Sequence, residues 1–348
     1  MDLYVHCCLP FFSFSLALLV CITNNIKATI AFNLTTLRFD ESYSPLFSEF
    51  NIKRSSDDRT VSLLLNRQSG SGIITTDYYN YGFFSASIKL PAYHTAGIVV
   101  AFYTSNADLF ERNHDELDIE FLGSVNDEPW RFQTNMYGNG SVSRGREERY
   151  KMWFDPTKET HRFSILWTPK NVIFYVDDVP IREIVRNEAM RGDFPSKPMS
   201  VYATIWDAST WATSGGRVKV DYKYQPFATD LSDLVLEGCL VDPIEQIPST
   251  NCTDRIIRLL QQPYSTLTPD GRRAMKNFRE NYMYYSYCYD NGRYPVTPPE
   301  CVIEPSQKEL FKENGRLRGK MASQRKRRRD QRGKPRRRKP VSRKAAIE

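Results

Sequence analysis

The sequence predicts an all-β fold, a sandwich or a barrel, over about residues 32–228. Short segments rich in β-branched and aromatic residues recur along this region, among them 82–90, 162–167 and 172–176. Turn signals separate them, for example the Asn-Gly pair at 139–140. Helical periodicity is nearly absent. Many short strands at close spacing are typical of sandwiches and barrels.

The first segment, residues 1–28, is typical of a secretory signal peptide. An apolar run extends from about Cys7 to Ile22 and ends in polar and small residues. A membrane anchor is the alternative, but the run is shorter than the roughly 20 apolar residues that a span requires, and no second run follows. We therefore expect a secreted protein. Three glycosylation sequons are consistent with this, and they begin at Asn33, Asn139 and Asn251.

A different pattern begins after the β-rich region. Residues 254–262 and 269–282 carry apolar residues at helical spacing, and the second segment follows a Thr-Pro-Asp helix start. Residues 229–305 are therefore expected to form a small, partly helical extension. At 348 residues, the chain is long enough for one large core and such a module.

Outside the leader, the cysteines form an even set in the C-terminal third of the chain. Secretion makes disulfides the default. Of the three connectivities, the short separations favour two small loops. Metal binding is the alternative, but no paired CxxC and no neighbouring His accompany these cysteines. The expected pairs are Cys239–Cys252 and Cys288–Cys301.

The net charge of +7 is unevenly distributed. Residues 306–348 carry 18 Lys and Arg against four Asp and Glu, a balance of +14, so the rest of the chain sums to −7. Blocks of like charge such as 325–329 repel one another. We expect residues 306–348 to be a disordered basic tail.

The segment 114–123, HDELDIEFLG, carries the most informative pattern. In a strand, Glu116, Asp118 and Glu120 lie on one face, and the apolar residues between them lie on the other. Acids are poor strand formers, and neighbouring like charges on one face repel. An unfavourable arrangement inside a well-patterned strand points to a function.

Cleavage of a glycosidic bond needs one ionised and one protonated carboxyl group. Three acids that repel one another share a proton and can supply both states. Four residues span about 13 Å along a strand at roughly 3.3 Å per residue, so the spacing does not choose between retaining and inverting chemistry. Calcium binding through the carboxylate oxygens and a solvated sheet face are the alternatives.

The same segment closely resembles the signature of the xyloglucan endotransglucosylase/hydrolases in glycoside hydrolase family 16. The similarity covers about residues 35–305 and includes segments within 133–147, 206–216 and 288–301 in the family's order. The resemblance implies a concave β-jelly-roll of two antiparallel sheets, retaining chemistry and xyloglucan as donor and acceptor. It also implies a monomer of the plant cell wall and apoplast, with neither a cofactor nor a metal. The four cysteines match the family's two sequential disulfides.

The resemblance further implies roles for individual residues. Glu116 matches the nucleophile, Glu120 the general acid/base, and Asp118 the assisting acid between them. Gly145 stands where Asn is common, and Thr210 where Asp is common. The positions expected to bind sugar are Gln133, Thr134, Asn135, Gly145, Arg146, Glu147, Thr210, Trp211, Gly215 and Arg293.

Three functions follow as hypotheses. A covalent glycosyl intermediate on Glu116 allows another sugar hydroxyl to replace water, so transfer of xyloglucan to another chain end is the leading one. A hydrolase of xyloglucan or mixed-linkage glucan is the second. The third is a glucan-binding lectin, against which the intact acids argue.

The basic tail has its own alternatives. Its charge runs are typical of nucleic-acid binding, which a signal peptide argues against. In a wall rich in uronic-acid polymers, the same charges would retain the protein in a salt-sensitive manner. We therefore expect acidic wall polysaccharide as its partner, and neither nucleic acid nor membrane.

Overall fold

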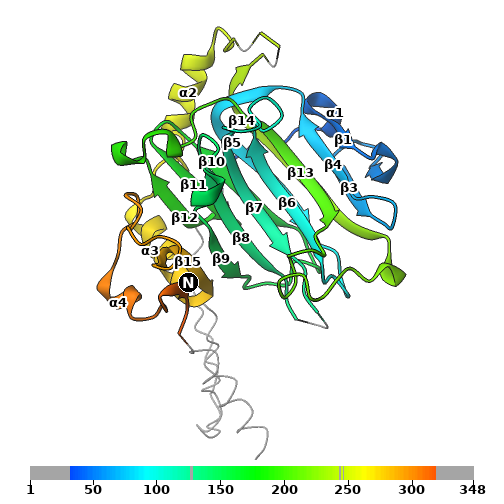
Figure 1. Ribbon diagram of the computed structural model, residues 1–348. Coiled ribbons are helices and arrows are strands. Elements are labelled where there is room, and N and C mark those ends of the chain that lie inside the picture. Colours follow the sequence, from blue (N-terminus) through cyan, green and yellow to red (C-terminus); the bar gives the residue numbers. More distant parts are fainter. Residues whose placement is uncertain (1–31, 126–127, 243, 246, 319–348) are drawn as a thin grey trace, which may run out of the picture.

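The computed structural model describes residues 32–318 except 126–127, 243 and 246. The predicted signal peptide and most of the predicted tail, residues 319–348, lie outside these residues. The described chain is an antiparallel sandwich of two sheets, which confirms the predicted all-β jelly-roll class (Figure 1). Among the described residues, no helix has the length and hydropathy that crossing a bilayer requires.

The first sheet has nine strands in the order β1-β4-β13-β6-β7-β8-β9-β15-β16. Its strands are β1 (Tyr43–Phe47), β4 (Ser71–Thr75), β13 (Ser200–Asp207), β6 (Ile98–Ser105), β7 (Glu116–Leu122), β8 (Arg131–Tyr137), β9 (Glu148–Lys151), β15 (Met283–Asp290) and β16 (Asn314–Arg316). The segment that sequence analysis singled out, β7, lies at its centre. Both of its neighbours, β6 and β8, pair with it along its whole length.

The second sheet has seven strands in the order β12-β11-β10-β5-β14-β3-β2. Its strands are β12 (Val179–Val185), β11 (Asn171–Val176), β10 (His161–Trp167), β5 (Tyr78–Lys89), β14 (Phe227–Val241), β3 (Thr60–Leu65) and β2 (Ile52–Arg54). The core lies between the sheets. Leu117, Ile119 and Phe121 of β7 are fully buried there, and the Phe121 ring meets Phe163 of β10 edge-to-face, with 4.6 Å between centroids. The predicted apolar face of β7 is thereby confirmed.

Helices occupy the ends and edges of the sandwich. The α-helices are α1 (Phe39–Ser42), α2 (Cys252–Gln261), α3 (Pro269–Tyr282) and α4 (Pro305–Lys308), and the 3-10 helices are η1 (Glu49–Asn51), η2 (Val142–Arg144), η3 (Glu188–Asp193) and η4 (Tyr222–Tyr224). The start of α3 is as predicted, because Pro269 is its first residue and Thr268 Oγ1 accepts a hydrogen bond from Gly271 N at 3.1 Å. Both predicted disulfides are present, Cys239–Cys252 and Cys288–Cys301.

The predicted boundary between residues 228 and 229 falls inside a strand. β14 runs from 227 to 241 and pairs with β3 and β5, so it belongs to the second sheet. β15, from the same C-terminal region, pairs with β9 and extends the first sheet. The C-terminal region carries the predicted helices and both disulfides, and it also contributes a strand to each of the two sheets.

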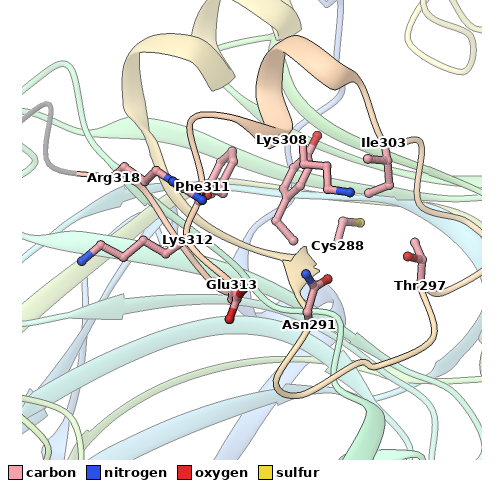
Figure 2. A pocket seen from close by; sticks show the side chains of 10 residues that line it. Cys288, Asn291, Thr297, Ile303, Lys308, Phe311, Lys312, Glu313 and Arg318 are labelled. Atoms are coloured by element: carbon pink, nitrogen blue, oxygen red, sulfur yellow. Dashed lines mark hydrogen bonds between the residues drawn. The ribbon is translucent and has the colours of Figure 1, made fainter.

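The expectation of disorder is wrong for residues 306–318. Phe311 is buried, and its ring stacks on Tyr289 with 4.5 Å between centroids. β16 pairs with β15, and Leu317 N donates to Tyr284 O at 3.1 Å. Figure 2 shows Phe311 and Lys312 of this segment beside a cavity of about 330 Å³. The apolar pair Leu310–Phe311 indicates an ordered segment, although the high net charge of residues 306–348 predicts disorder.

Candidate active site

Three acids project from β7 on the side opposite the core. Cross-strand register decides their neighbours, because residues paired across a sheet share a face. Asp118 lies between Tyr103 of β6 and Asn135 of β8, and Glu120 lies opposite Gln133. The outer face of the nine-stranded sheet therefore carries the acids together with amide and phenol groups.

Each outer acid has a polar side chain close to it. Gln133 Nε2 donates a hydrogen bond to Glu120 Oε2 at 2.6 Å. At the other end of the strand, His114 Nε2 lies 4.0 Å from Glu116 Oε2. Among the described residues, no Arg or Lys forms an ion pair with any of the three acids. Their negative charges are therefore held mainly by neutral donors.

Burial raises the pKa of all three carboxyl groups. The effect is strongest for Asp118, which is 6% exposed and also feels the charges of Glu116 and Glu120. The hydrogen bond between Asp118 and Glu116 lowers the pKa of Glu116 and raises that of Asp118. A proton shared by this pair therefore stays on Asp118 and leaves Glu116 ionised.

The burial of Asp118 and the raised pKa values of all three acids argue against the solvated-face alternative. A solvated face would leave all three carboxylates hydrated, with pKa values near their usual range. The calcium alternative gains no support, because the described residues contain no group of three or more His, Cys, Asp and Glu arranged to hold a metal ion.

Asp115, which sequence analysis did not assign, anchors the start of β7. Its side chain is 1% exposed and accepts hydrogen bonds from the backbone N–H groups of Asn139, Ser196 and Lys197 at 2.7–2.8 Å. Lys197 Nζ lies 2.8 Å from the same carboxylate. Asp115 thus connects two loops to the start of β7. Among the described residues, it forms an ion pair with a lysine, unlike the neighbouring Glu116.

Several of the predicted sugar-binding residues surround the acids. Gln133 and Asn135 lie on the same face, and Asn135 Nδ2 donates to Tyr137 Oη at 2.7 Å. Gln133, Trp211 and Gly215 line a cavity of about 520 Å³ at the Leu122 end of β7. Trp211 is 40% exposed. A hollow with an exposed indole ring beside the acids suits a sugar, whose C–H faces pack on aromatic rings.

Two predicted sugar contacts do not reach this face. Thr134 alternates with Gln133 and Asn135 along β8, so it points to the core; it is fully buried, and its Oγ1 accepts from Arg182 Nη1 at 2.8 Å. Arg146 is 3% exposed, with Nε 2.5 Å from Glu300 and Nη2 3.0 Å from Asp193. We therefore assign neither side chain as a sugar contact.

Three further predicted residues, Glu147, Thr210 and Arg293, are not among those that line the cavity. Glu147 pairs with Arg149, and its charge raises the pKa of Glu120. Thr210 is exposed beside Trp211. The Arg293 guanidinium lies over the Tyr294 ring, 5.7 Å from its centroid.

Gly145 stands where Asn is common in the family, and the packing around it explains the glycine. A Cβ at this position would lie 2.8 Å from Tyr137 Cε1, on a ring near the acids. The Gly145 carbonyl also accepts a hydrogen bond from Tyr294 Oη. An Asn here would have to displace the Tyr137 ring.

Sequence reasoning missed further residues on this face. Tyr103 and Tyr202 stack with 4.8 Å between their centroids and 10° between their planes, next to Asp118. Arg149, Tyr284 and Arg316 line the cavity together with Trp211. Register with β7 would have identified Tyr103, but the others come from strands whose pairing no local signal reveals.

Comparisons with known proteins cover most of the chain. The family model of glycosyl hydrolases family 16 matches residues 39–224, and that of the xyloglucan endo-transglycosylase C-terminus matches 252–301. Two relatives from Arabidopsis thaliana are "Probable xyloglucan endotransglucosylase/hydrolase protein 30", 57% identical over 92% of this chain and 93% of its own, and protein 29 of the same description, 58% identical over 82% and 83%. A solved structure, a prokaryotic β-1,3-1,4-glucanase (lichenase) derived from a mouse hindgut metagenome, is 22% identical with a TM-score of 0.46 over 58% of this chain and 97% of its own.

Proposed function

Since the chain belongs to the xyloglucan endotransglucosylase/hydrolases of glycoside hydrolase family 16, we propose that its β7 acids cleave a xyloglucan backbone and pass it to another xyloglucan chain end. One observation carries the proposal. Three acids lie on one face, and among the described residues none of them forms an ion pair with Arg or Lys. The hydrogen bond with Asp118 lowers the pKa of Glu116 and raises that of Asp118, while burial and the charge of Glu147 raise the pKa of Glu120. Opposed protonation is what two-carboxylate glycosyl transfer requires.

The first step forms a covalent intermediate. The ionised Glu116 carboxylate attacks the anomeric carbon, and the bond from that carbon to the glycosidic oxygen breaks. Glu120 gives its proton to that oxygen, and the leaving glucan departs with a new hydroxyl. Asp118 holds its proton towards Glu116, which keeps the nucleophile charged before the attack and stabilises it again when it leaves.

The second step transfers the sugar. Glu120, now a carboxylate, accepts the proton of an incoming hydroxyl, whose oxygen attacks the anomeric carbon and releases Glu116. If the hydroxyl belongs to a sugar, the step is transfer, and if it belongs to water, the step is hydrolysis. Gln133 keeps Glu120 facing this position through its 2.6 Å hydrogen bond.

Transfer is favoured because the cavity beside Glu120 offers a surface to a sugar acceptor. The Trp211 indole is exposed, and Gln133 Oε1 is buried without a hydrogen-bond partner among the described residues. An acceptor hydroxyl would satisfy that oxygen and displace water from the intermediate. Hydrolysis of xyloglucan or mixed-linkage glucan is the second function, in which water occupies this position.

Two measurements on one reaction distinguish these functions. Purified protein is incubated with xyloglucan polymer and a labelled xyloglucan oligosaccharide, and both polymer-bound label and new reducing ends are measured. Label without matching reducing ends indicates transfer. Reducing ends alone indicate hydrolysis. If neither signal appears, the protein does not cleave xyloglucan, and the lectin hypothesis is supported.

The location and the tail belong to the same proposal. Secretion to the cell wall and apoplast is supported by the apolar leader and by the exposure of the three sequon residues, Asn33, Asn139 and Asn251, which we propose as glycosylation sites. The tail binds acidic wall polysaccharide through its +14 charge, and the protein acts as a monomer without cofactor or metal. Elution from isolated walls that did not respond to salt would contradict the role of the tail.

A further inference from the structure

The cavity beside Glu120 is strongly basic, although the centre of the same sheet face is acidic. Four arginines line it, Arg131, Arg149, Arg217 and Arg316, against the single acid Glu128. A neutral glucan needs no such charge, because its hydroxyl groups and C–H faces are recognised by neutral polar groups and aromatic rings. The excess of positive charge therefore requires a separate explanation.

Ion pairs account for only two of these arginines. Arg131 Nη2 lies 3.1 Å from Glu128, and Arg149 pairs with Glu147. Arg217 donates its Nε–H to Ser214 O at 3.0 Å, and neither it nor Arg316 forms an ion pair within the described part of the chain. Both side chains are exposed. The guanidinium groups of Arg217 and Arg316 can therefore bind a ligand at the cavity wall.

Arg316 reaches the cavity through the ordered C-terminal segment. β16 pairs with β15, placing Arg316 opposite Tyr285, and the stacked Phe311 and Tyr289 rings hold the segment against the sheet. Lys312, four residues earlier, lines the other cavity, that of Figure 2. The same segment therefore presents one cation to the cavity of the active face and another away from it.

The cavity also contains an unsatisfied acceptor. Gln133 is 5% exposed and donates its amide N–H to Glu120, while its Oε1 has no hydrogen-bond partner among the described residues. This oxygen suits a sugar hydroxyl next to the acid/base. Unpaired guanidinium groups at the same cavity suit a carboxylate, which they bind with paired N–H donors.

We propose that this cavity takes an anionic acceptor, a glycan carrying uronic-acid carboxylates, and that Arg316 and Arg217 select it. The inference rests on the proposed transfer function and names a substrate class for its second step. An acceptor hydroxyl attacks the glycosyl-Glu116 intermediate and gives its proton to Glu120. The carboxylate stays ionised and forms no bond to the transferred sugar.

A matched pair of acceptors tests the proposal. Labelled cellotetraose and the labelled β-1,4-linked glucuronate tetrasaccharide differ only in the carboxylates at C6. With xyloglucan as donor, we expect the wild-type protein to show a lower KM for the glucuronate. Arg316→Gln should lower the kcat/KM ratio of glucuronate to cellotetraose about fivefold through KM, as expected for loss of one partly exposed charged hydrogen bond. Raising the salt concentration should lower the ratio in the wild type.

Lys312→Gln is the control, because it removes the same charge from the same segment outside this cavity. It should leave the ratio unchanged. Equal KM values for the two acceptors in the wild type, or equal effects of the two variants, would overturn the inference. Transfer to a xyloglucan oligosaccharide without transfer to the glucuronate would overturn it while the proposed function stands. Failure of transfer to every acceptor would contradict both.

Discussion

One buried carboxylate, Glu148, and the three acids of β7 lie on opposite faces of one sheet and behave in opposite ways. Glu148 of β9 is 2% exposed and accepts hydrogen bonds from Arg279, Ser286 and Tyr150, the last two at 2.8 and 2.6 Å. Burial raises its pKa, but the charges of Arg279 and Arg182 outweigh burial and lower it to about 2. Asp118 of β7 is buried as well, and Glu116 and Glu120 are half-buried, yet the pKa values of all three are raised.

The difference lies in the partners and not in the burial. A carboxylate that supports the fold is surrounded by cations and hydroxyl donors, as Glu148 is. The β7 acids have amides, phenols and one another as neighbours, so part of their charge is unfavourable in the folded protein. Such an arrangement persists where chemistry needs a proton held near neutrality.

The largest effect is expected for Glu116→Gln. An amide cannot attack the anomeric carbon, so both transfer and hydrolysis should fall by about 10³-fold or more. The midpoint of thermal unfolding should not fall, because Glu116 forms no ion pair with Lys or Arg within the described part of the chain. Glu188→Gln, an exposed acid elsewhere, is the matched control and should keep full activity. Near wild-type turnover of the Glu116 variant would rule out the nucleophile assignment.

Glu148→Gln should affect the fold and not the chemistry. The substitution leaves Arg279 and Arg182 buried without their anion, so unfolding in denaturant at pH 7 should show a loss of about 3–5 kcal/mol. The folded pKa of Glu148 is lowered, so its contribution is present above the unfolded value of 4.5 and disappears as the pH falls towards 2. Glu147→Gln, its half-buried neighbour, should lose far less stability. Equal losses for both would contradict the special role of Glu148.

Asp118→Asn should separate activity from stability. Loss of the shared proton should lower transfer about 10²-fold. The pKa of Asp118 is raised well above 3.8, so its contribution to folding is present below that pH and is lost as the pH rises through the raised value. An uncharged Asn avoids that loss. The variant should therefore unfold at a higher denaturant concentration than the wild type at pH 7, and at a similar one at pH 3.

Gln133→Met should have the smallest effect. The hydrogen bond from Gln133 lowers the pKa of Glu120, although burial raises it overall. Removing the donor should move the alkaline limb of the pH–rate profile to higher pH and lower kcat about tenfold. An unmoved alkaline limb would show that Glu120 is not the group that this limb reports.

The contrast also explains what the sequence could predict. Alternation along β7 was sufficient to place the three acids on one face and their apolar neighbours on the other. The same rule, applied to β8, places Thr134 on the core side and argues against the sugar contact that the family resemblance implies for it. The pairing register between strands could not be predicted from the sequence. In the run of four charged residues Arg146–Arg149, nothing local shows that Glu148 meets a helix and that Glu147 lies on the acid side.

In the C-terminal segment, the sequence predicted too little structure. Its charge predicted disorder for all of residues 306–348, but a short strand, one buried Phe and a Gly at φ 69° are sufficient to order residues 306–318. Edge pairing supplies backbone hydrogen bonds whatever the side chains are. A count of charges cannot detect that, whereas the Leu-Phe pair and the Asn-Gly turn can.

The covalent intermediate tests the central claim most directly, that Glu116 attacks the sugar while Glu120 handles the proton. The protein is mixed with xyloglucan, quenched in acid within the first turnover and digested, and its peptides are weighed. We expect a peptide containing Glu116 to carry added xyloglucan mass, and the Glu116→Gln protein to carry none. Turnover with sugar attached to another residue, or with no attached sugar at any quench time, would contradict the assignment.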